Sequence, residues 1–177
     1  MKLLLFLFLT FLFLFPPRSG GQRTTSPGTE DTSAVERTKY VGLRHGASLP
    51  KGLKDVGGGL VSRLNDAKEY KISEVRRDRV RMLWFEYLTH RDQASAPYWE
   101  VKDVLILPRI RRNQVLVYTL CFSGQKPDSE IVAIADYQRY AEFFTRVRRA
   151  WRANRSVERF EEISPRRIKC SNEGYGL

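Results

Sequence analysis

Four apolar runs follow one another closely in the middle of the chain, and they constrain the fold more than any other feature. The runs are Val80–Leu88, Trp99–Leu107, Gln114–Phe122 and Glu130–Ala135. They are rich in β-branched, aliphatic and aromatic residues, and the segments between them carry the Gly, Pro, Asp and Asn residues typical of turns. Closely spaced runs joined by short turns predict an antiparallel meander.

The segment after the fourth run predicts a helix from Asp136 to Asn154. Asp136 can accept hydrogen bonds from the exposed amides of a first helical turn. An apolar stripe recurs there at three- and four-residue spacing, formed by Tyr137, Tyr140, Ala141, Phe144, Val147 and Trp151. Residues 155–163 predict an added edge strand. We therefore expect an α+β fold, a mostly antiparallel four- to five-stranded meander with a C-terminal amphipathic helix packed on one face.

An earlier segment, Leu53–Asn65, also shows helical spacing of its apolar residues. Three glycines, Gly57–Gly59, interrupt it, and each costs about 1 kcal/mol relative to alanine in a helix. This favours a helix broken at the glycines. The alternative is a phosphate-binding glycine loop, which lacks the Gly-Lys-Ser/Thr ending that such loops require.

The N-terminus has the three parts of a secretory signal. Lys2 gives a positive charge, Leu3–Phe15 is apolar apart from one Thr, and small residues follow up to Gly21. The run is shorter than the about 20 residues of a spanning helix, although an uncleaved anchor is the alternative. We expect residues 1–21 to be a signal peptide, 22–39 a flexible polar linker and 40–177 a single α+β domain. The expected location is the periplasm, the thylakoid lumen or the extracellular space.

The chain has two cysteines, Cys121 and Cys170. An even pair in a small exported domain predicts a disulfide, with two unpaired thiols as the alternative. Neither cysteine belongs to a Cys-x-x-Cys redox pair.

The composition is strongly basic, with a formal net charge of +11 and arginine outnumbering lysine by 22 to 9. Guanidinium groups bind carboxylate, sulfate and phosphate through two-point contacts. Arg139, Arg146, Arg149 and Arg152 lie on the predicted helix away from its apolar stripe. They predict either a solvated polar face or a surface for an acidic protein, an anionic lipid or an acidic polysaccharide. Nucleic acid is not expected, since exported proteins seldom meet it.

No catalytic motif of useful specificity is present, so we expect an exported, non-catalytic binding or accessory module without a cofactor. A zinc site from both histidines and both cysteines lacks the close ligand spacing that such sites show. The alternative function is a hydrolase of envelope polymers that uses His90, Asp92 and Asp103, which flank one loop.

Several segments of the second half resemble a set of exported cyanobacterial proteins of unassigned function. They are WEVKDVLILP, QVLVYTLC, EIVAI, AWRAN, FEEI and the closing CSNEGYGL, between about Tyr98 and Leu177. The resemblance implies a bacterial periplasm or thylakoid lumen. It would make the glycosylation triplet at Asn154 irrelevant, and it carries no activity or site residue.

Overall fold

The computed structural model describes Val35 and residues 37–61 and 66–176. Within these ranges the chain is built almost wholly of antiparallel strands, and its one helical segment is a short turn that ends at Tyr40. The predicted signal peptide and most of the predicted linker lie outside the described residues. No helix in the described ranges is long and apolar enough to cross a membrane.

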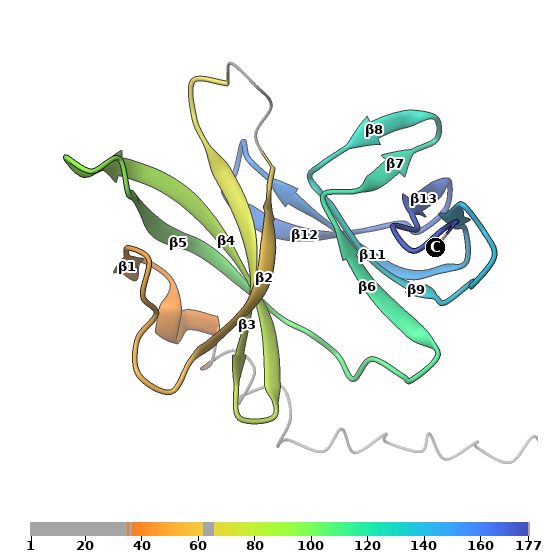
Figure 1. Ribbon diagram of the computed structural model, residues 1–177, viewed down its shortest axis with the longest axis horizontal. Coiled ribbons are helices and arrows are strands. Elements are labelled where there is room, and N and C mark those ends of the chain that lie inside the picture. The colour runs from red at the N-terminus through yellow and green to blue at the C-terminus, as the bar shows by residue number, and fades with distance from the viewer. Residues whose placement is uncertain (1–34, 36, 62–65, 177) are drawn as a thin grey trace, which may run out of the picture.

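The strands form three sheets (Figure 1). Sheet A has the order β1-β5-β4-β3-β2, sheet B the order β12-β11-β9-β6, and sheet C the order β10-β13-β7-β8. In sheet A the bounds are β1 Arg44–His45, β2 Lys54–Leu60, β3 Tyr70–Arg77, β4 Val80–Arg91 and β5 Pro97–Ile106. In sheet B they are β6 Gln114–Tyr118, β9 Ile131–Asp136, β11 Val147–Asn154 and β12 Arg159–Ile163. In sheet C they are β7 Cys121–Ser123, β8 Lys126–Asp128, β10 Phe143–Phe144 and β13 Ile168–Ser171.

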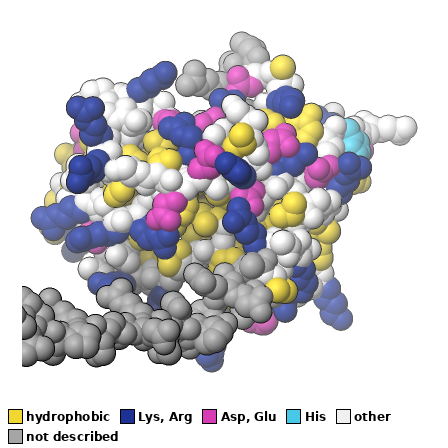
Figure 2. All heavy atoms as spheres, turned by 180° about the vertical axis from the view of Figure 1, so that it is seen from behind, with side chains coloured by type: hydrophobic (Ala, Val, Ile, Leu, Met, Phe, Trp, Pro, Cys, Tyr) yellow, Lys and Arg dark blue, Asp and Glu magenta, His cyan; other side chains and the backbone are white. Residues whose placement is uncertain are grey.

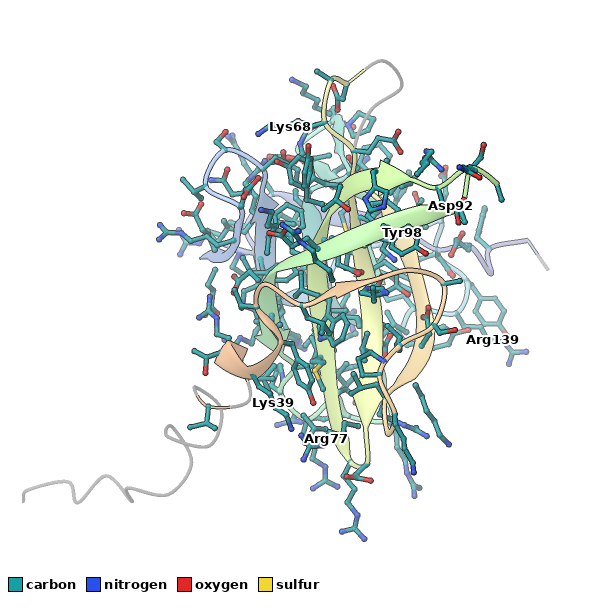
Figure 3. All side chains as sticks on the ribbon, turned by 90° about the vertical axis from the view of Figure 1, so that its left-hand side faces the viewer. Lys39, Lys68, Arg77, Asp92, Tyr98 and Arg139 are labelled. Carbon is teal, nitrogen blue, oxygen red and sulfur yellow. A yellow bond between two sulfur atoms is a disulfide. The ribbon has the colours of Figure 1, made fainter. Side chains whose placement is uncertain are left out.

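The sheets are stacked, and an apolar cluster fills each space between them. Phe85 of sheet A packs with Trp151 of sheet B in the first cluster. Ala133 of sheet B shares the second cluster with Ile168 of sheet C. In the third, Trp84 on the other face of sheet A is covered by the segment that starts at Tyr40 and contains β1 (Figure 3). Sheet B is therefore covered on both faces, which explains why β9 is apolar from Ile131 to Ala135.

The strands predicted from the four apolar runs are confirmed. Three of the four apolar runs correspond to β4, β5 and β9. The run Gln114–Phe122 is divided between β6 and β7 at Thr119, whose φ of 64° turns the chain from sheet B into sheet C. The predicted edge strand is also present as β12, at the outer edge of sheet B.

The α+β prediction is wrong, because the C-terminal helix Asp136–Asn154 does not form. Asp136 ends β9, and the chain then makes a loop, the short β10 and the eight-residue β11. The apolar stripe is not a single face, since Phe144 and Trp151 are buried whereas Tyr140 is 83% exposed. Trp151 and Ala150 point to opposite sides of β11, into two different clusters.

The helix expected at Leu53–Asn65 is also wrong where the structure describes it. Lys54–Leu60 is an edge strand, β2, with a bulge between Asp55 and Gly57. A Cβ on Gly59 would lie 2.6 Å from the Thr119 hydroxyl, so glycine there lets sheet A approach the β6–β7 turn closely. The glycines therefore serve strand packing and form no phosphate loop. The predicted residues 62–65 lie outside the described residues.

Candidate functional site

Of the four arginines predicted to share a face, Arg139, Arg149 and Arg152 lie apart, whereas the charge of Arg146 helps to lower the pKa of Asp136. Arg152 on β11 forms ion pairs with Asp128 and Glu130 at 2.7 and 2.8 Å. Arg149 lies on the other side of β11, with its guanidinium 4.7 Å from the centre of the Trp151 ring. Arg139 projects from the β9–β10 loop beside Tyr140 (Figure 3). Their common surface depended on the helix and is lost with it.

Basic side chains are widely spread over the molecule, with acidic ones among them on the face seen from behind (Figure 2). Charge alone therefore does not single out a site. One place nevertheless brings arginines together around a hollow, at the end of sheet B where β6 begins, β9 ends and β11 begins.

We call this hollow the arginine groove, with a volume of about 460 Å³. Its lining contains four arginines and one carboxylate: Arg109, Arg111, Arg148, Arg149 and Asp136. The first two arginines come from the β5–β6 connection, and the other two from the start of β11. The register Gln114↔Asp136 and Ala135↔Val147 holds the three strands in place beneath them.

Two of the four groove arginines form ion pairs with carboxylates. Arg148 bonds Asp136, and this bond and the positive charge lower the pKa of that carboxyl below its usual range. Arg149 makes a two-point contact with Glu162, whose closest pair is 2.9 Å apart. Among the described residues, Arg109 and Arg111 have no ion-pair partner. The groove therefore keeps unneutralised positive charge beside two guanidinium groups of fixed orientation.

A second hollow continues the arginine groove. It shares Pro108 and Arg149 with it and reaches Arg37 by way of Leu107 and Trp151. Arg37 binds both carboxylate oxygens of Asp103, at 3.0 and 2.9 Å. The two hollows together give an elongated path with arginines along its length.

The residues of the hydrolase alternative do not converge. His90 is exposed and stacks on Tyr98, with ring centres 4.7 Å apart, and Asp92 accepts two backbone N–H bonds inside the hairpin turn. Asp103 is buried opposite Phe85, five positions from His90 along β4. That separation is about 17 Å along a strand.

A buried polar cluster lies on the covered face of sheet A. The Glu86 carboxylate, which is fully buried, lies 2.5 Å from His45 Nε2, and its second oxygen faces the Lys71 ammonium at 3.4 Å. The ring of Trp84 packs edge-on to His45, and the ring of Trp99 lies 4.5 Å from Lys71. The cluster ties β1 to the centre of the sheet and was not found from the sequence.

We expect the stability of the protein to fall above neutral pH because of His45. Burial lowers the pKa of His45, but its bond to Glu86 and the carboxylate charge outweigh burial, so the pKa is raised above 6.5. A raised pKa stabilises the fold fully below 6.5, and this stabilisation is lost as the pH rises through the pKa of the folded state. Unfolding free energies between pH 6 and pH 9 measure it. In His45→Gln the unfolding free energy should depend less steeply on pH over this range. An unchanged pH dependence would contradict the stabilising role of the His45–Glu86 contact.

The arginine groove contains one predicted residue, Arg149. Arg109 and Arg111 belong to the basic segment Pro-Arg-Ile-Arg-Arg-Asn at 108–113, and nothing in the local sequence predicts that they lie beside β11. No group of His, Cys, Asp and Glu able to hold a metal ion occurs among the described residues. The two cysteines are bonded to each other, as predicted.

Comparison with protein-family models, curated proteins and solved structures found no match.

Proposed function

We propose that the chain is an exported, non-catalytic binding module whose arginine groove binds an acidic polysaccharide. The observation that carries the proposal is the gathering of four guanidinium groups around one groove with a single carboxylate in its lining. Arginine forks match the planar geometry of carboxylate and sulfate groups, and such charge-assisted bonds are stronger than neutral ones.

The shape of the groove favours a polysaccharide over the other acidic partners. A membrane surface is flat and would contact protruding residues, whereas these arginines surround a hollow. A folded acidic protein would bury a broad patch with an apolar centre. A flexible chain with repeated acidic groups can follow the elongated path from Arg111 past Arg149 to Arg37.

Export is part of the same proposal and is supported by the disulfide between Cys121 and Cys170, since disulfides persist in oxidising compartments. Cleavage after Gly21 gives a mature chain that begins at Gln22. Intact-mass measurement of the exported protein tests this. A soluble cytosolic form that retains Met1 would contradict it.

Retention on immobilised heparin tests the groove. Replacing Arg109, Arg111 and Arg149 by Ser removes three cations from one hollow. At roughly 0.5–1 kcal/mol for each contact, binding should weaken about ten- to a hundredfold and elution should move to lower salt.

The matched control replaces Arg76, Arg79 and Arg166, which are exposed elsewhere, by Ser. It removes the same charge and leaves the groove intact, so elution should change little. Equal losses in the two variants would show that net charge alone binds heparin, and the proposal would then be wrong.

A further inference from the structure

The strand β6 has one unpaired edge. Val115 and Val117 lie opposite Ala135 and Ala133 of β9. The Tyr137 N–H donates to the Asn113 carbonyl, and the Thr119 N–H donates to the Ile131 carbonyl. The odd-numbered residues of β6 therefore form the backbone hydrogen bonds to β9. The backbone groups of Leu116 and Tyr118 therefore point away from β9. Within the described ranges, these groups have no hydrogen-bond partner.

This edge runs along a groove of about 680 Å³, which we call the β6 groove. Residues 115–120 form its floor. Gly58, Glu74 and Arg81 of sheet A line one side, and residues 171–174 line the other. One residue of the glycine run, Gly58, and the closing Ser-Asn-Glu-Gly segment thus border one hollow.

The edge lacks the features that usually prevent strand addition. Its sequence, Gln114–Tyr118, contains no charge and no proline, and its pairing with β9 has no bulge. The opposite edge of the same sheet, β12, carries Arg159, Glu161 and Glu162. The edge strand β8 of sheet C contains a lysine and a proline. The β6 edge is thus both unpaired and unprotected.

We propose that the β6 groove binds an extended peptide segment of another protein, which adds to sheet B as a strand beside β6. The backbone of an added strand can form hydrogen bonds with the N–H and C=O groups that alternate residues of β6 direct outward. An extended segment needs less room beside this edge than a second folded copy, because Glu74, Arg81 and residues 171–174 also line the groove. The inference is independent of the arginine groove.

The charged residues of the β6 groove indicate which kind of peptide binds there. Arg81 is neutralised by Glu74 at 2.7 Å, whereas Glu173 is exposed and forms no ion pair among the described residues. Burial, with the charges of Glu74 and Asp55, raises the pKa of Tyr118. The groove is therefore acidic on a basic protein, and the bound segment carries a lysine or arginine that meets Glu173.

A pool of capped, randomised hexapeptides passed over the immobilised full chain tests the proposal. Retained peptides should alternate β-branched residues with others and should be enriched in lysine or arginine. Leu116→Pro removes an outward N–H without breaking a bond to β9, and retention should fall at least tenfold. Leu116→Ile keeps the N–H and should retain the peptides as the wild type does.

Two further measurements keep the test independent of folding. Glu173→Lys, at an exposed position, should shift the retained pool from basic to acidic peptides. Amide exchange at Leu116 and Tyr118 should slow at least tenfold when a retained peptide binds, whereas Val115 and Val117 are protected throughout. Retention that is absent, or equal in the wild type and Leu116→Pro, would overturn the proposal, as would a dimer formed through β6.

Discussion

Replacing Cys121 and Cys170 together by alanine is expected to lower the free energy of unfolding by about 4 kcal/mol. The two residues face each other across β7 and β13 and are 49 positions apart. Their bond closes a long loop, which restricts the unfolded chain more than the folded one. Both side chains are buried in the cluster between sheets B and C, so alanine leaves a small apolar residue in each place.

Guanidinium unfolding of the oxidised wild type, the reduced wild type and the double variant measures this effect. The free energy of unfolding should fall by similar amounts in the reduced protein and in the double variant. A loss below about 1 kcal/mol in both would show that the bond adds little, and that packing alone holds β13 in sheet C.

Asp103→Ala is expected to destabilise the protein by roughly 2–4 kcal/mol. The buried carboxylate accepts bonds from the Arg37 guanidinium and from the Phe160 N–H at 2.7 Å. Phe160 belongs to β12, so Asp103 links sheet A to sheet B. Alanine would leave this buried N–H and half-buried Arg37 without their acceptor.

Asp103→Asn keeps one acceptor oxygen and should lower the free energy of unfolding less than Asp103→Ala does. The matched control is Asp92→Ala, at an exposed turn, which should cost about 1 kcal/mol or less. Denaturant unfolding compares the three. Similar losses for Asp103→Ala and Asp92→Ala would contradict the bridging role of Asp103.

The strands β4, β5, β6, β7, β9 and β12 could be predicted from the sequence, because aromatic and β-branched runs between turn residues form strands in almost any context. The strands β10 and β11, between Asp136 and Asn154, could not. Strand β11 buries Ala150 on one face and Trp151 on the other but exposes Arg148 and Arg149, so its residues do not alternate between apolar and polar. Trp151 and Phe144 then fell by chance at helical spacing from exposed Tyr137 and Tyr140.

The disulfide could be predicted from the even number of cysteines and the expectation of export, without any knowledge of the fold. The arginine groove did not, because it joins a turn after β5 to the start of β11, and only the sheet register brings them together. The contact between buried Glu86 and His45 could not be predicted either, because the two residues are 41 positions apart. Sequence patterns report periodicity within a segment and carry no information on such pairings.

We propose that an acidic chain binds in the arginine groove and not to the basic surface at large. Titration of the full chain with a heparin hexasaccharide, followed by NMR of the arginine Nε–H groups, tests it directly. We expect saturable shifts at Arg109, Arg111, Arg148 and Arg149, and no comparable shift at Arg139 or Arg152. Shifts of similar size at Arg76, Arg79 and Arg166, without saturation, would contradict the claim.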